Sequence, residues 1–213
     1  MKESLLKAVL TLIFLFVGAL SLLAQNRFPS QMWYKGNIYG TDGQTYTGLV
    51  KYDLDNNLVQ LQTETISTFS ASNVSHFEIH NLTNDGLRRF YSLPYSLNGV
   101  GETQVFFEVL TEGNDITLLC REYIETNYRW IGGTAGGHSI VETQYKTSYR
   151  LAFNYYFIKN GSIEKYSLKR KDLFAMLPRH DKELDLFMKK NKLEHDKRGD
   201  LLRITAYYND LQN

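Results

Sequence analysis

Hydrophobic and polar residues alternate along most of the chain in short runs. The run at residues 58–64 reads LVQLQTE, and the run at residues 74–80 reads VSHFEIH. A period of two residues is typical of β-strands that bury one face. Similar runs recur along the chain and predict strands over residues 33–39, 45–53, 58–64, 74–80, 88–93, 104–111, 116–124, 145–158 and 162–168.

Turn residues separate these runs at short intervals. Asp42-Gly43, Asn56-Asn57 and Gly113-Asn114-Asp115 each lie between two predicted strands, and Asn160-Gly161 is the strongest hairpin signal. Short turns join antiparallel neighbours. The sequence therefore predicts a mainly β fold, with eight or more strands in an antiparallel meander that is rolled or barrel-like.

The period changes from two to about 3.6 residues after residue 168, which indicates helices. Pro178 ends the first helix, the second ends near Asn191, and Asp200 or Gly199 is expected to cap the third. The apolar positions of the three helices are Leu173, Met176 and Leu177, then Leu184, Phe187 and Met188, then Leu201, Thr205, Tyr208 and Leu211. Such short helices need a surface to pack on. We expect a β-rich domain over residues 25–168, with the helical segment 169–213 packed on it.

The N-terminus carries an uncharged apolar run from Ala8 to Leu23, preceded by Lys2 and Lys7. Sixteen residues span about 24 Å as a helix, which is short of a bilayer core. The run fits a signal peptide over residues 1–24, cleaved after Ala24. The chain is then exported to the periplasm or the extracellular space, with no transmembrane span left after cleavage.

Charge and cysteine content narrow the class of protein. The formal net charge is +1, and loss of the predicted signal peptide makes it zero, so nothing draws the chain to nucleic acid. Cys120 is the single cysteine and lies in the apolar run ITLLC, where we expect a buried, inert thiol.

Three segments carry candidate chemistry. His76, Glu78 and His80 share one face of a predicted strand, but the outer two lie about 13 Å apart, too far for one metal ion, so we interpret them as a solvent-facing surface. The glycine-rich loop from Gly132 to Ser139 lacks the lysine of a phosphate-binding loop. Residues 165–198 are rich in Lys and Arg, which favours either a solvated helix face or a surface for an acidic partner. We assign no catalytic residue, metal ligand or cofactor.

Two resemblances extend this interpretation. Residues 35–80, with four or five short strands and Asp/Asn turns, are similar to small SH3-like barrels. The chain also resembles a group of uncharacterised secreted proteins of the Bacteroidota, which implies a Gram-negative envelope location and no known activity. The segments that carry this second resemblance are Leu22-Leu23-Ala24-Gln25, residues 106–110 and 118–122, residues 168–173, Asp200-Leu201-Leu202 and Tyr207-Tyr208-Asn209.

Two functions of different classes follow. The first is a non-catalytic binding module of the cell envelope, with an envelope protein or glycan as its partner. Tyr128, Trp130 and His138 are the candidate contact residues, because aromatic side chains beside a loop make effective contact points. The alternative is a secreted hydrolase of glycans or peptides, with its site near the Gly132–Ser139 loop. The sequence favours the first and leaves the oligomeric state open.

Overall fold

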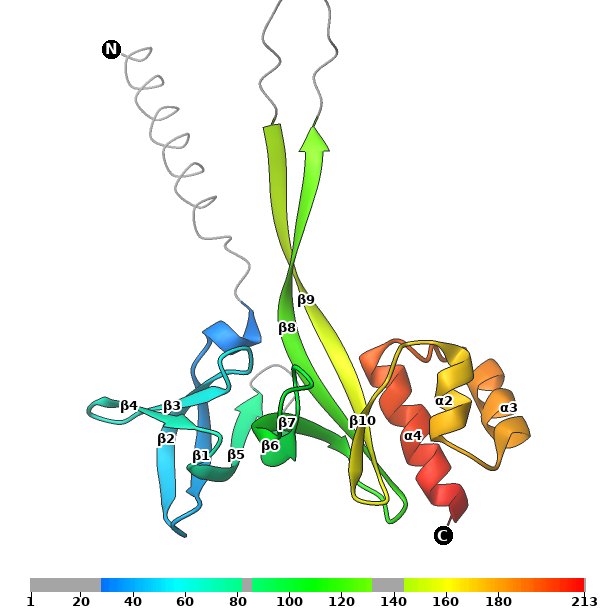
Figure 1. The fold of residues 1–213 in the computed structure, drawn as a ribbon, viewed down its shortest axis with the longest axis horizontal. Coiled ribbons are helices and arrows are strands. Elements are labelled where there is room, and N and C mark those ends of the chain that lie inside the picture. The colour runs from blue at the N-terminus through cyan, green and yellow to red at the C-terminus, as the bar shows by residue number, and fades with distance from the viewer. Residues whose placement is uncertain (1–27, 82–85, 132–143, 213) are drawn as a thin grey trace, which may run out of the picture.

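The computed structural model describes residues 28–81, 86–131 and 144–212, so the predicted signal peptide lies outside the described residues. A ten-stranded sheet forms the body, and three α-helices cover one part of it (Figure 1). The elements are η1 (Pro29–Gln31), β1 (Tyr34–Gly40), β2 (Thr45–Asp53), β3 (Leu58–Gln62), β4 (Ile66–Ser70), β5 (Val74–Asn81), β6 (Gly86–Tyr95), β7 (Thr103–Thr111), β8 (Ile116–Ile131), β9 (Gln144–Lys159), β10 (Ser162–Lys165), α2 (Arg170–Met176), α3 (Asp181–Asn191) and α4 (Arg198–Gln212).

The strand order is β10-β9-β8-β7-β6-β5-β1-β2-β3-β4, and all neighbouring strands pair antiparallel. The predicted fold class, mainly β with eight or more antiparallel strands followed by three helices, is confirmed. The sheet is open, with β4 and β10 as its ends. Sequential strands are neighbours except β4 and β5, because β5 pairs with β1 instead. The similarity to an SH3-like barrel stays a prediction.

Most predicted boundaries differ by one or two residues from the structure, and β4 was not among the predicted strands. β8 continues to Ile131, seven residues beyond its predicted end. β10 ends at Lys165, three residues before its predicted end. The predicted cap of the third helix is wrong, because α4 begins at Arg198 and places both Gly199 and Asp200 in its first turn. The Asp200 carboxylate instead accepts a hydrogen bond of 3.0 Å from the backbone N–H of Glu194.

One apolar core is formed by side chains of β1 to β7. Its centre is aromatic: Phe77 and Phe90 are stacked with ring centroids 4.5 Å apart, and Phe106 meets Phe77 edge-on at 5.2 Å. All three are completely buried. Because these residues lie on β5, β6 and β7, the rings join three adjacent strands into one packed unit.

A second core lies between the helices and the inner parts of β8 and β9. Leu173, Leu184 and Leu201, one from each helix, are fully buried in it together with Cys120. Burial raises the pKa of the Cys120 thiol, as expected for an inert cysteine. The helices therefore pack on the sheet, and they hold the base of the β8–β9 hairpin. Among the described residues, no helix combines the length and apolar character needed to cross a membrane.

Two glycines give opposite predictions for stability. Gly199 lies in α4 with open space around its Cα, so Gly199→Ala is expected to stabilise the fold by about 0.5–1 kcal/mol. A Cβ on Gly36 would meet the carbonyl oxygen of Glu78 at 2.1 Å, so Gly36→Ala is expected to destabilise it by about 1–3 kcal/mol. Urea unfolding of both variants checks the prediction, and equal effects of the two would contradict it.

Candidate functional site

The outer half of the β8–β9 hairpin leaves the body as a two-stranded ribbon (Figure 1). The two strands pair continuously from Ile116↔Lys159 to Ile131↔Gln144. β7 pairs with β8 only at residues 118–120, and β10 pairs with β9 only at residues 156–159. Beyond these points the ribbon has no neighbouring strand in the part of the chain that the structure describes. At about 3.3 Å per residue, residues 121–131 extend about 33 Å.

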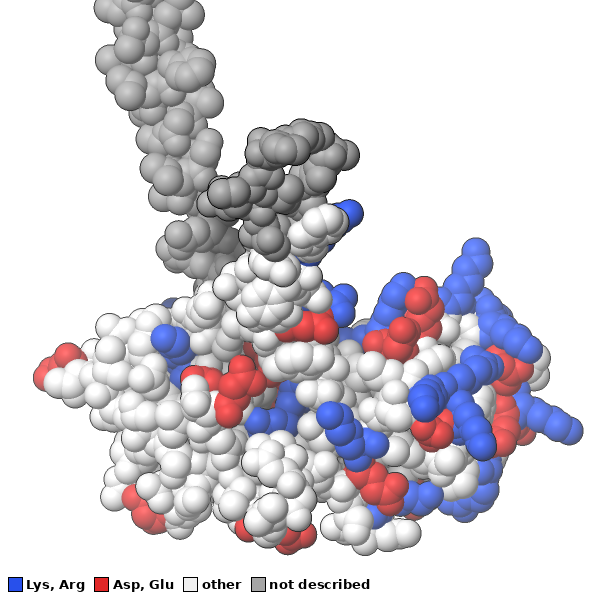
Figure 2. Space-filling model, turned by 45° about the horizontal axis from the view of Figure 1, so that its top comes forward, with Lys and Arg blue, Asp and Glu red and all other residues white. Residues whose placement is uncertain are grey.

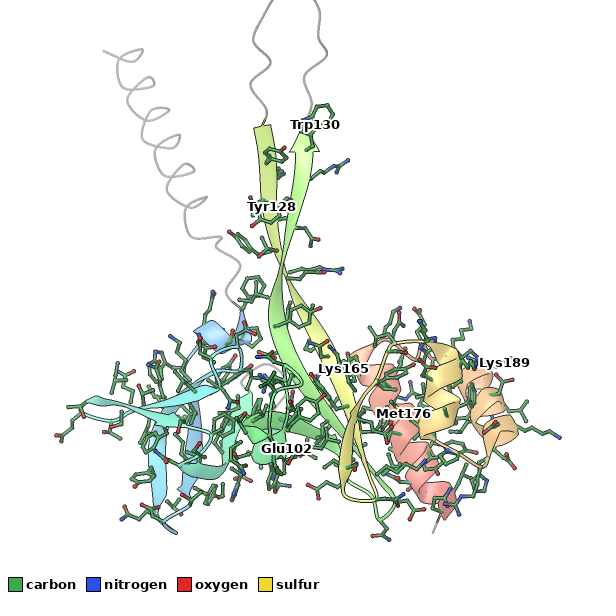
Figure 3. All side chains as sticks on the ribbon, in the orientation of Figure 1. Glu102, Tyr128, Trp130, Lys165, Met176 and Lys189 are labelled. Atoms are coloured by element: carbon green, nitrogen blue, oxygen red, sulfur yellow. The ribbon has the colours of Figure 1, made fainter. Side chains whose placement is uncertain are left out.

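One face of this ribbon is aromatic and apolar. Residues directly opposite each other in an antiparallel pair share a face, so the register places Trp130 beside Tyr145, and Thr126 beside Tyr149. Tyr128 lies between Thr126 and Trp130 on β8 and shares their face. Figure 3 shows Tyr128 and Trp130 on the part of the ribbon that projects beyond the body. Tyr128, Trp130, Tyr145 and Tyr149 are defined here as the aromatic face.

The aromatic face is open to solvent. The exposed fractions are 73% for Tyr128, 61% for Trp130, 65% for Tyr145 and 58% for Tyr149. Isolated exposed apolar residues are common, but neighbouring exposed aromatic rings mark interaction sites. The two described residues of the sequence prediction, Tyr128 and Trp130, thus lie together on this face. His138 and the whole Gly132–Ser139 loop lie outside the described residues.

A hollow of about 700 Å³ lies at the foot of the aromatic face. Phe28 and Gln31, beside and within η1, form one wall, and Ile124 and Tyr149 of the ribbon form another. An apolar group that lies along the aromatic face can therefore enter a recess where the ribbon joins the body. Recesses of this kind hold the anchoring side chains of binding partners.

The opposite face of the ribbon is polar and charged. Glu125 and Arg150 are directly opposite each other and form an ion pair. Nearer the end of the ribbon, Arg129 lies directly opposite Lys146. Like charges in directly opposed positions destabilise a strand pair. Neither cation has a carboxylate within ion-pair distance among the described residues.

A buried cluster of charged side chains lies below the ribbon and was not predicted from the sequence. Arg88 on β6 binds Glu108 on β7 through two hydrogen bonds of 2.7 and 2.8 Å. The same guanidinium donates to Glu122 on β8 at 2.9 Å and to the Tyr52 hydroxyl at 2.9 Å. Arg198 of α4 adds a hydrogen bond of 2.5 Å to Glu108. These five residues, called the ionic cluster, join four strands to the last helix.

The ionic cluster borders a cavity of about 350 Å³, but its charges do not suit acid–base catalysis. Its two arginines and two glutamates balance in charge. Burial acts to raise the pKa of Glu108, but hydrogen bonds and charge from Arg88 and Arg198 outweigh it, so the pKa is lowered. A carboxylate held ionised between two arginines is a poor proton donor. The cluster is therefore a structural connection between the sheet and α4.

The lowered pKa of Glu108 predicts a pH dependence of stability. A group whose pKa is lowered by folding stabilises the protein above its unfolded pKa, about 4.3, and loses this contribution as the pH falls through the folded value. The difference in unfolding free energy between the wild type and Glu108→Gln is expected to be largest at pH 7 and to shrink below about pH 5. Urea titrations from pH 7 to pH 3 check this, and a constant difference would contradict it.

The His76, Glu78 and His80 set on β5 has no metal-binding geometry. His76 stacks on Tyr39 with ring centroids 4.0 Å apart, and Glu78 binds Arg89 at 2.8 Å. His80 is exposed, whereas Phe77 and Ile79 on the other face are fully buried. The interpretation as a polar outer surface is confirmed. No group of three metal-ligating side chains occurs within residues 28–81, 86–131 and 144–212.

The basic stretch covers the helical part of the molecule. Figure 2 shows Lys and Arg side chains gathered over the helices, interspersed with acidic ones. Asp185 on α3 binds both Arg170 and Lys189, the latter at 2.7 Å. Internal pairing of this kind is typical of a solvated helix face, and a role toward an acidic partner stays a prediction.

Comparison of the chain with protein-family models, curated proteins and solved structures gives no match. The resemblance to secreted proteins of the Bacteroidota therefore stays a prediction, and the geometry of the ribbon is the main guide to function.

Proposed function

We propose that this protein is a non-catalytic interaction module of the bacterial cell envelope, exported by its N-terminal signal, and that it binds a partner protein with the aromatic face of the β8–β9 ribbon. The observation that carries the proposal is the exposure of Tyr128, Trp130, Tyr145 and Tyr149 together on one side of a projecting element. Trp and Tyr are enriched among the few residues that carry most of the binding energy in protein interfaces.

The surroundings of the aromatic face support this function. The helices and the ionic cluster fix the base of the ribbon, because Cys120 and Tyr155 are buried in the helix core and Glu122 is held by Arg88. A ribbon held at its base presents its rings in one orientation, which lowers the entropy lost on binding. The hollow beside Phe28 gives the partner a place for an anchoring side chain.

Affinity capture tests the proposal. The tagged, processed protein is used to capture proteins from detergent-solubilised envelopes of its host, and the captured species are compared among variants. Trp130→Ala and Tyr128→Ala are each expected to reduce capture of one defined protein about 30-fold, which corresponds to about 2 kcal/mol. Lys146→Ala, on the polar face of the same ribbon and outside the hollow, is the matched control and is expected to leave capture unchanged.

Two outcomes would contradict the proposal. Equal capture by the wild type and the Trp130→Ala variant would exclude the aromatic face as the contact surface. Capture of a species that survives protease treatment of the envelopes would identify a glycan as the partner.

A further inference from the structure

We propose that two copies of this chain associate through the free edge of β8, in antiparallel register with Asn127 on the two-fold axis. The dimer does not depend on the proposed partner, because it uses the edge of the ribbon and leaves the aromatic face open. The strand that pairs with this edge belongs to a second copy of the chain. Charge complementarity between the two copies favours this pairing.

The edge of β8 has unused hydrogen-bonding capacity. From Arg121 to Ile131 the backbone pairs with β9 on one side only, since β7 stops pairing with β8 at Cys120. An exposed strand edge of this length is a template for another strand. The two end strands of the sheet, β4 and β10, have only five and four residues. The ribbon therefore offers the longest free edges among the described strands.

The charges on β8 fit a second copy of themselves. With Asn127 on the axis, a residue that precedes Asn127 in one copy lies opposite the residue that follows Asn127 by the same number of positions in the other copy. Glu125 of each copy therefore faces Arg129 of the other copy. Each cross-strand pair of opposite charge is favourable. The pairing supplies a carboxylate to Arg129, which has Lys146 as its neighbour on β9 within its own chain.

Other arrangements of the two copies are less favourable. An axis at Glu125 would place two carboxylates against each other, and an axis at Arg129 would place two guanidinium groups against each other. Pairing through the β9 edge with Ser148 on the axis would oppose Lys146 to Arg150, two cations. A shift of one residue would place charged side chains opposite aromatic ones. The axis at Asn127 is the register that pairs opposite charges on both sides.

The dimer has a consequence for the aromatic face. Directly opposed residues of an antiparallel pair lie on the same face, so Tyr128 faces Thr126 of the second copy and Trp130 faces its Ile124. The four strands in the order β9-β8-β8-β9 would form one continuous sheet with both aromatic faces on the same side. Such an isologous contact is closed and does not grow into a filament.

Disulfide trapping tests the position of the axis. In an antiparallel pair, directly opposite Cα atoms are about 4.5–5.5 Å apart, within the range of a disulfide. In the processed full-length chain, Asn127→Cys is therefore expected to give a covalent dimer under mild oxidation. Ser148→Cys, directly opposite Asn127 on β9, is the matched control and is expected to stay monomeric on a non-reducing gel. The native Cys120 is buried and does not interfere.

Charge reversal tests the register independently. Arg129→Glu places the introduced carboxylate of each copy opposite Glu125 of the other copy. The substitution is expected to weaken the dimer at least about 10-fold in sedimentation velocity, because two like-charge pairs form. It also gives Lys146 an acidic neighbour, so the ribbon itself gains stability.

A compensating set of changes separates the dimer contact from the stability of the ribbon. The double variant Glu125→Arg with Arg150→Glu keeps the ion pair within the chain but is expected to break the dimer, and adding Arg129→Glu is expected to restore it. A wild type that is monomeric at all concentrations, or a triple variant that fails to recover the dimer, would overturn the proposal.

Discussion

Replacing Arg88 with methionine is expected to lower the free energy of unfolding by about 3–5 kcal/mol. Arg88 is the one residue of the ionic cluster that contacts Glu108, Glu122 and the Tyr52 hydroxyl together. Methionine retains the apolar bulk but leaves Glu122 buried without its cation, and the exposed fraction of both glutamate side chains is only 3%. Leaving a charge buried without a partner is among the largest effects that a single substitution has.

Arg89→Met is the matched control for this prediction. Arg89 also binds a carboxylate, that of Glu78, but 52% of its side chain is exposed. Water replaces the lost interaction there, so the expected cost is at most about 1 kcal/mol. Chemical denaturation of the two variants at pH 7 gives both values. Similar losses in Arg88→Met and Arg89→Met would show that the cluster does not connect the sheet to α4.

Truncating Leu201 to alanine is expected to cost about 2–5 kcal/mol of stability. Leu201 lies in α4, is fully buried, and packs in the core that contains Cys120 and Tyr155 at the base of the ribbon. The substitution removes apolar contacts and leaves a cavity between helix and sheet. If helices and sheet fold as one unit, near-ultraviolet and far-ultraviolet circular dichroism will report the same, lowered transition midpoint.

Leu186→Ala makes the same chemical change on α3 at a position where 67% of the side chain is exposed. Its expected effect is within about 0.5 kcal/mol. Different near-ultraviolet and far-ultraviolet midpoints in Leu201→Ala would contradict this expectation, because the helices and the sheet would then not unfold as one unit.

The fold was largely predictable because period-two alternation and turn residues are local signals. The Thr45–Asp53 strand, for example, has the predicted bounds. The outer half of β8 was missed although Ile124, Thr126, Tyr128 and Trp130 keep the alternation. The side chains of that segment are largely exposed in the structure. The strand prediction looked for strands that bury one face on a core, and this segment does not do so. The cap of α4 was misplaced because Asp200 binds a backbone group of the preceding loop, a contact that the sequence does not reveal.

The candidate site was predictable only in part. Tyr128 and Trp130 stood out as aromatic residues beside a loop, but Tyr145 and Tyr149 join them only through the β8–β9 register. The ionic cluster connects residues as far apart as Glu108 and Arg198, so no local pattern reveals it. Its one sequence signal is a charged residue within an apolar strand, as Glu108 is within FFEVL. Such a residue must find a partner when the strand is buried.

A photo-cross-linking scan along β8, in the cells that produce the protein, tests directly whether the aromatic face is the contact surface. A photoreactive phenylalanine analogue is placed singly at Thr126, Tyr128 and Trp130, and then at Glu125, Asn127 and Arg129. We expect cross-links to one other protein from the first set and none to it from the second, because the two sets lie on opposite faces of the ribbon. Cross-links to that protein from both sets alike, or from neither, would contradict the assignment of the aromatic face as the contact surface.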